Sequence, residues 1–204
     1  MKSYECFEPK ERQIELVPLM LFGEQSHKQM NHNYGKVDIW LHGSLMLQYI
    51  FGFDDPYKVT KSLLSLEPKE IINIGNDKSG SHVIETFLQS QTVGPKHKAL
   101  LIDKLRGSYV DLANDRFGSR IVDHILATVD IKLKASIMDE LVEKESHLNT
   151  TRNGYYLAKK SGLYHYKNRN DEWREEERLR TKRRRHMEDL FDDSEPRFRV
   201  QRFK

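Results

Sequence analysis

Residues 76–85 read NDKSGSHVIE, and residues 114–123, placed 38 positions later, read NDRFGSRIVD. The glycines of these phrases, Gly80 and Gly118, belong to a longer series, in which Gly43 precedes and Gly154 follows at spacings of 37 and 36 residues. A fixed period of ~20–50 residues is typical of proteins built from stacked repeats, which present equivalent side chains in a row. The series therefore predicts an elongated repeat array.

The segment after each glycine has the pattern of an amphipathic helix. At ~100° per residue, the polar residues after Gly80 share one narrow face and the apolar residues fall on the opposite arc. The positions of this face hold, in chain order, Ser44, Leu45 and Gln48; Ser81, His82 and Glu85; Ser119, Arg120 and Asp123. Asp77 and Asp115 stand three residues before their glycines, where a helix N-cap is expected.

The stretches between these helices are also apolar at helical spacing. They cover residues 57–66, 68–74, 95–105 and 131–144, and Pro, Gly or Asn separates them. Alternating β-branched runs with hairpin turns are absent from the sequence. Each unit is therefore expected to hold about three helices, and the fold class is an all-α helical solenoid of about four repeats, the last of them degenerate.

Three regions follow from this pattern. Residues 1–37 are expected to be a partial preceding repeat, with a helix over 11–22 and a polar loop over 23–36. Residues 38–167 hold the repeats. Residues 168–204 are expected to form a long charged helix over 168–190 and a disordered charged tail.

Charge and composition narrow the function classes. The net charge of +3 is carried by residues 165–204, which hold 13 basic and 10 acidic residues, so the remainder of the chain is neutral. Nucleic-acid binding must therefore depend on the polar face and not on overall basicity. The single cysteine fits a reducing compartment. No membrane span or secretory signal is expected, because no apolar run approaches ~20 residues.

Enzyme chemistry finds no support in the sequence. His27 and His32 lack metal-type spacing to a cysteine or a carboxylate pair, and there is no phosphate loop or dinucleotide fingerprint. Ser81 and His82 are neighbours on a helix face and cannot act as nucleophile and base. No catalytic residue, metal, cofactor or small-molecule ligand is expected.

Repeats with this length and this helix opening resemble Pumilio-type repeats. The resemblance implies that the first and fifth polar positions meet the Watson–Crick edge of one RNA base and that the second position stacks on bases. Ser81 and Glu85 would then meet a base edge beside the stacking His82. Ser119 and Asp123 would meet the edge of the next base beside the stacking Arg120. In the first unit, Ser44 and Gln48 would meet a base edge.

The family's pairing habit refines these roles. Serine with glutamate favours guanine, and Ser44 with Gln48 favours adenine. Asp123 departs from the habit because it is shorter than glutamate, and Leu45 departs because it stacks weakly. The last unit carries Tyr155, Tyr156 and Lys159, which match no base code. It resembles a cap or a repeat that contacts the RNA backbone through Tyr156 and Lys159, and the two tyrosines either pack or stack.

The resemblance can be narrowed to the C-terminal third of the nucleolar protein nine family, over residues 38–178. It is carried by residues 40–48, by the Gly80 and Gly118 phrases and by residues 163–173, which read LYHYKNRNDEW. It implies a nucleolar protein that binds precursor rRNA near the 3′ end of the small-subunit (18S) rRNA. Such a protein restrains cleavage of the precursor at that site and contacts preribosomal proteins. The family has further N-terminal repeats, so a fragment or a shortened paralogue is expected.

Other interpretations stay open. The chain could be a cytoplasmic Pumilio-type regulator of mRNA translation, a protein-binding helical scaffold without an RNA role, or a fragment that folds poorly. A basic run, composed of Lys182, Arg183, Arg184 and Arg185, is either a nuclear localisation signal or a phosphate-binding patch. It could also be an exposed helix face paired with the glutamates at 175–177.

Overall fold

The computed structural model describes residues 16–30 and 39–192, with side chains described over 16–23 and 39–187. Every regular element in these ranges is a helix, as predicted, and none is long and apolar enough to cross a membrane. The helices are α1 (Leu16–Met30), α2 (Leu41–Ile50), α3 (Tyr57–Ser65), α4 (Pro68–Gly75), α5 (Gly80–Gln89), α6 (Pro95–Lys104), α7 (Tyr109–Asn114), α8 (Gly118–Thr128), α9 (Ile131–Glu143), α10 (Glu145–Leu148), α11 (Arg152–Ser161), α12 (Leu163–Asn168) and α13 (Asn170–Asp192).

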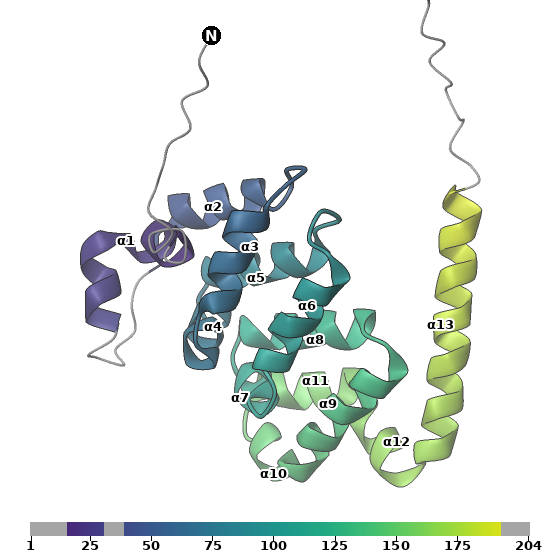
Figure 1. Ribbon diagram of the computed structural model, residues 1–204. Helices are drawn as coiled ribbons and strands as arrows, with labels where there is room; N and C mark the ends of the chain where they lie inside the picture. Colours follow the sequence, from purple (N-terminus) through teal and green to yellow (C-terminus); the bar gives the residue numbers. More distant parts are fainter. Residues whose placement is uncertain (1–15, 31–38, 193–204) are drawn as a thin grey trace, which may run out of the picture.

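The helices repeat in threes, which confirms the predicted unit. The units are α3 to α5, α6 to α8 and α9 to α11; α1 and α2 precede them, and α12 and α13 follow (Figure 1). We call α2, α5, α8 and α11 the glycine-led helices, because each has a periodic glycine in its first turn. They contact one another in sequence, α2 with α5, α5 with α8 and α8 with α11, and so build one continuous surface.

The periodic glycines allow a close approach between consecutive helices. A Cβ atom at each glycine would fall almost onto the last carbonyl groups of the helical segment that precedes it. Its distance to that oxygen would be 1.8 Å at Gly43, 2.4 Å at Gly80, 2.7 Å at Gly118 and 2.0 Å at Gly154. Real Cβ atoms essentially never come within 3.0 Å of such an atom, so any larger side chain would push the two helices apart. The repeat period therefore has a packing cause.

Asp77 and Asp115 make the predicted bonds to the first turns of α5 and α8, although the N-cap residues of these helices are Ser79 and Phe117. The Asp77 carboxylate accepts a hydrogen bond from the backbone N–H of Gly80 at 2.9 Å, and Asp115 accepts one from Gly118 at 3.0 Å. In the last unit the Thr151 hydroxyl has this role and accepts from the N–H of Gly154 at 3.0 Å. These oxygens satisfy donors that the first turn of a helix would otherwise leave unpaired.

The apolar arcs of the glycine-led helices form the core. Val83, Ile84 and Phe87 of α5 are at most 1% exposed, and the corresponding residues of α8 are equally buried. The Phe51 and Phe87 rings meet edge to face, with centroids 5.3 Å apart, and so connect the units of α2 and α5. Because the apolar residues are buried, the polar faces turn outward along the row.

Tyr109 is a polar group buried within this core. It is 2% exposed, and its hydroxyl donates to the Ile102 carbonyl at 2.8 Å. Burial, followed by the nearby Glu140 carboxylate, raises the pKa of Tyr109 far above its ordinary value. The phenol is therefore held in its neutral, donating form.

At the N-terminal end the structure corrects one prediction. The polar loop expected over 23–36 is wrong for residues 24–30, because α1 continues to Met30 after a kink at Gly23. Gly23 has φ 71° and ψ 171°. A Cβ added at this residue would lie only 2.9 Å from the nearest ring atom of Trp40. This left-handed backbone favours glycine and lets the helix bend around the indole. Residues 11–15 of the predicted helix and 31–36 of the loop lie outside the described residues.

The predicted charged helix is α13, which begins two residues late because α12 ends at Asn168. Its first turns are anchored to the last unit. Trp173 is 3% exposed and meets the Tyr166 ring at 4.7 Å, and Glu177 forms a largely buried ion pair with Lys134 of α9 at 2.7 Å. In Figure 1 α13 then stands beside the stack. The tail at 193–204 lies outside the described residues.

Candidate nucleic-acid interface

The polar positions of the glycine-led helices occur in register along the row, because the units repeat. The described residues at these positions are Ser44 and Gln48 on α2; Ser81, His82 and Glu85 on α5; Ser119, Arg120 and Asp123 on α8; and Tyr156 and Lys159 on α11. The structure shows how each of them is held and which side chains from neighbouring helices they meet.

The serines at the first position are engaged within the fold. Ser44 is fully buried; its hydroxyl donates to the Ser79 carbonyl at 2.7 Å and accepts from the Gln48 amide at 3.0 Å. Ser81 is 1% exposed and bonds to the Lys78 carbonyl at 3.3 Å, and Ser119 bonds to its own turn in the same way. Their direct contact with a base stays a prediction. The hydroxyls of Ser81 and Ser119 bond within their own first turns, whereas that of Ser44 joins α2 to the start of α5.

Glu85 is the centre of a three-residue cluster that spans two units. One carboxylate oxygen lies 3.2 Å from Nδ1 of His82, and the other lies 3.3 Å from Nε of Arg120 on α8. The Glu85 side chain is 14% exposed, whereas those of His82 and Arg120 are 45% and 57% exposed. The two predicted stacking groups therefore flank the predicted reading group.

Asp123 repeats this arrangement one unit later. Its carboxylate meets Nζ of Lys160 on α11 at 2.6 Å. Lys160 was not among the residues predicted from sequence, because it stands one position after the fifth polar position, which Lys159 occupies. Arg120 and Lys160 stand at different positions of their units, two residues after Gly118 and six after Gly154, so the repeat gave no signal for Lys160.

The last unit presents aromatic rings. Tyr155 and Tyr156 are each 54% exposed, with ring centroids 6.0 Å apart in an edge-to-face contact. The Arg152 guanidinium lies over the Tyr156 ring at 5.5 Å, and Lys159 is exposed beside it. Of the two roles left open by the sequence, this exposure favours a ring that can receive a base.

Stacking groups and charges of both signs thus alternate along one surface. The ion pair of Asp123 with Lys160 is exposed and contributes ~0–1 kcal/mol, so it can be exchanged for other contacts at small cost. Glu85 is only 14% exposed and needs a new donor whenever Arg120 leaves it. At Leu45, which is 43% exposed, the stacking position holds an aliphatic side chain. No group of three or more His, Cys, Asp or Glu side chains suited to a metal ion occurs in the described part of the chain.

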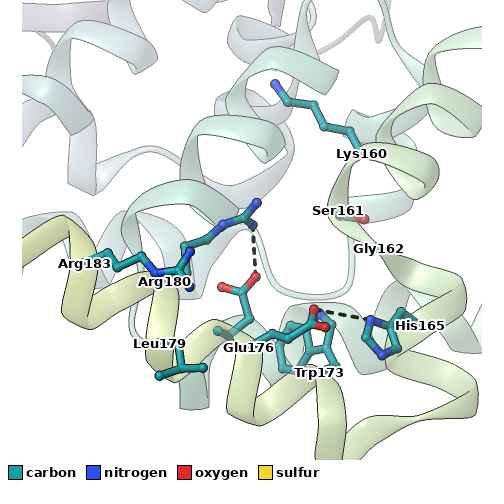
Figure 2. A pocket seen from close by; sticks show the side chains of 10 residues that line it. Lys160, Ser161, Gly162, His165, Trp173, Glu176, Leu179, Arg180 and Arg183 are labelled. Atoms are coloured by element: carbon teal, nitrogen blue, oxygen red, sulfur yellow. Dashed lines mark hydrogen bonds and ion pairs between the residues drawn. The ribbon is translucent and has the colours of Figure 1, made fainter.

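The predicted basic run lies on the last turns of α13, beside the glycine-led helices. Arg184 donates a hydrogen bond to the Ala127 carbonyl at the end of α8. Arg183 lines a pocket between α11, α12 and α13 (Figure 2), whereas Lys182 and Arg185 are not among the residues that line it. The run is therefore divided between different surroundings.

Three-helix units, glycine-led packing and a row of stacking and hydrogen-bonding groups define a Pumilio-type helical repeat protein. The NOP9-like PUF repeat domain matches residues 4–156, and the chain belongs to this family. Human nucleolar protein 9 is 28% identical over 95% of this chain and 33% of its own length. Pumilio homolog 23 of Arabidopsis thaliana is 35% identical over 65% of this chain and 18% of its own.

Solved structures agree with this assignment. The structure of APUM23 with GGAUUUGACGG superposes with a TM-score of 0.72 and 31% sequence identity, covering 82% of this chain and 32% of the other. A second APUM23 structure, with GGAAUUGACGG, superposes with a TM-score of 0.71 and covers the same fractions of the two chains. The chain spans about a third of the length of the nucleolar protein 9 relatives from human and mouse.

Proposed function

We propose that this chain is an RNA-binding part of a small-ribosomal-subunit assembly factor. It binds precursor rRNA near the 3′ end of the small-subunit rRNA and regulates its processing. The observation that carries the proposal is the cluster of Glu85, His82 and Arg120, in which a carboxylate lies between two groups able to stack on bases. The RNA-containing structures of APUM23 support it.

The geometry suggests how one base is bound. A guanine that enters between His82 and Arg120 offers its π face to both and its N1–H and N2–H₂ to the Glu85 carboxylate. Arg120 must then exchange its 3.3 Å contact with Glu85 for the base. Each good stacking or bidentate edge contact contributes ~1–3 kcal/mol. The guanine supplies Glu85 with new donors and Arg120 with a stacking partner, and these contacts offset the loss of their ion pair.

The place of action follows from the relatives. Those from human, mouse and several fungi are named nucleolar protein 9, and we place this chain in the nucleolus with them. Its partners would be precursor rRNA and proteins of the preribosomal particle. Lys182 and Arg185, the members of the basic run that neither line the pocket nor bond to α8, are then the residues most accessible to an import receptor.

The first test is a comparison of two RNAs. The purified chain is titrated with an RNA that spans the 3′ end of small-subunit rRNA and its downstream spacer, and with a scrambled strand. Both titrations are repeated after His82, Glu85, Arg120 and Asp123 are changed to Ala. A matched control changes the same four residue types away from the glycine-led helices: His97, Asp103, Arg106 and Glu143. We expect the chain to prefer the rRNA probe over the scrambled strand. The variant at His82, Glu85, Arg120 and Asp123 should lose this preference, and the control variant should keep it.

Single substitutions then separate reading from stacking. Glu85→Gln should alter base preference at one position, because the amide replaces one acceptor with a donor. His82→Ala should weaken binding to all four bases by about 1–3 kcal/mol with the preference retained. If both substitutions acted equally on all four bases, the assignment of Glu85 as the reading residue would be wrong.

A further inference from the structure

A pocket of about 450 Å³ lies between the end of α11, α12 and α13, at one edge of the row of glycine-led helices (Figure 2). Lys160 enters it from α11, and Arg180 and Arg183 enter it from α13. The other ionisable side chains that line it are His165, Glu176 and Glu177. Three permanent cations thus line a single hollow.

The orientation of α13 decides which members of the basic run reach this pocket. Trp173 is 3% exposed and therefore marks the side of α13 that faces the stack. At ~100° per residue, Arg180 lies within about 20° of Trp173 around the helix and Arg183 lies about 80° from it. Lys182 and Arg185 lie about 180° and 120° away and face solvent. The anchored first turns fix this orientation.

The acidic residues of the pocket already have partners. Glu177 pairs with Lys134 at 2.7 Å and with Arg180 at 3.1 Å, and Glu176 lies 3.5 Å from His165. Arg183 is exposed and forms no hydrogen bond or ion pair within the described part of the chain. Its guanidinium therefore remains available to an anion.

The pocket is continuous with the candidate RNA-binding surface. Lys160 lines the pocket, and its Nζ also contacts Asp123 on α8 at 2.6 Å with 70% of the side chain exposed. Lys160 thus lies between a predicted base-contacting residue and Arg183. A guanidinium binds two phosphate oxygens in a fork, and an ammonium adds a point charge.

We propose that this pocket binds a backbone phosphodiester of the RNA that lies on the glycine-led helices, with Arg183 as the main donor and Lys160 as the second. The proposal rests on the RNA-binding function proposed above. It assigns Arg183 to RNA and leaves Lys182 and Arg185 outside the interface. The C-terminal ends of α8 and α11 carry partial negative charge, which attracts cations. This effect accounts for Arg184, which bonds to the Ala127 carbonyl at the end of α8, but it does not account for Arg183.

The test compares two arginines of the same run. Arg183→Gln and Arg185→Gln remove the same charge from the same helix, one inside the pocket and one outside it. The probe is GGAAUUGACGG, the RNA of the APUM23 structure, extended at both ends with oligouridine. Dissociation constants are measured against potassium chloride concentration. Arg183→Gln should weaken binding about tenfold and lower the slope of log K against log salt by about 1, with base preference unchanged. Arg185→Gln should leave both quantities near the wild-type values.

Other outcomes of this comparison would contradict the proposal. Equal weakening by both substitutions would show that only total charge matters, and the pocket site would be wrong. Wild-type affinity in both variants would show that neither arginine contributes to binding of this RNA, and the pocket site would be wrong. If the unmodified chain bound neither this RNA nor the rRNA probe, the proposed function itself would fail. Lys160→Gln, which lies on another helix, should reproduce the lower salt slope.

Discussion

Gly154→Ala gives the sharpest test of the role assigned to the periodic glycines, because two effects of opposite sign compete there. Gly154 is the third residue of α11, and alanine inside a helix is favoured over glycine by ~1 kcal/mol. The new Cβ, however, would lie 2.0 Å from the Leu148 carbonyl oxygen and 2.3 Å from Oδ1 of Asn114. The start of α11 would have to move by about 1 Å to reach the shortest distance that real Cβ atoms show.

The overpacking should outweigh the gain in helix propensity. Overpacking costs about 1–3 kcal/mol, and here the displaced groups include backbone. The Asn114 side chain also accepts a 2.7 Å hydrogen bond from Thr151, which the displacement would strain. With overpacking at the upper end of this range, about 3 kcal/mol, less the ~1 kcal/mol of helix propensity, we expect a net loss of about 2 kcal/mol. This corresponds to ~4–8 °C in melting temperature for a chain of this size.

Thermal unfolding followed by circular dichroism measures the effect. Gly94→Ala is the control, because its Cβ would lie 3.7 Å from the nearest atom, Nδ1 of His97, at an ordinary φ of −61°. The control should stay within about 1 kcal/mol of the wild type. A Gly154→Ala variant that melted at or above the wild-type temperature would refute the packing explanation of the repeat period.

Three further outcomes are expected. Lys134→Met should destabilise the chain by about 3 kcal/mol, because Glu177 loses its buried partner. The same change should make α13 more sensitive to proteolysis. The double variant with Glu177→Leu should recover most of the lost stability. Lys160→Met should change base preference at the position that Asp123 is proposed to contact, since the freed carboxylate gains acceptor capacity. Binding to RNAs varied at one base measures this change. The pKa of Tyr109 is raised in the folded chain. Its contribution to the free energy of unfolding is therefore complete below pH ~10 and is lost as the pH rises further. In urea titrations above pH ~10, the free energy of unfolding of Tyr109→Phe should fall less steeply with pH than that of the wild type.

Much of the fold follows from the sequence because repetition reinforces weak signals. The helices over 57–66, 68–74, 95–105 and 131–144 agree with α3, α4, α6 and α9 within one residue at each end. The short helices α7 and α10 were not separately predicted, since six and four residues are too few to show a period. The kink at Gly23 depends on the distant Trp40 ring, which no local pattern reveals.

The candidate site was only partly predictable. The polar positions follow from the helical period, but the cross-helix pairs do not. Whether Arg120 reaches Glu85, or Lys160 reaches Asp123, depends on how one unit is rotated against the next. That rotation is set by packing between units, and the sequence of one unit does not contain it. The burial of Ser44 and Ser81 has the same origin.

The anchored C-terminal helix has a consequence for how the array opens. In a linear stack each unit touches only its neighbours, so a terminal unit normally frays independently. Here α13 is fixed to α9 through Lys134 and Glu177 and reaches back to α8 through Arg184. The last two units are therefore tied together by a brace outside the stack. Hydrogen exchange in α8 and α11 should report one shared opening event, which makes this end of the array a single cooperative block.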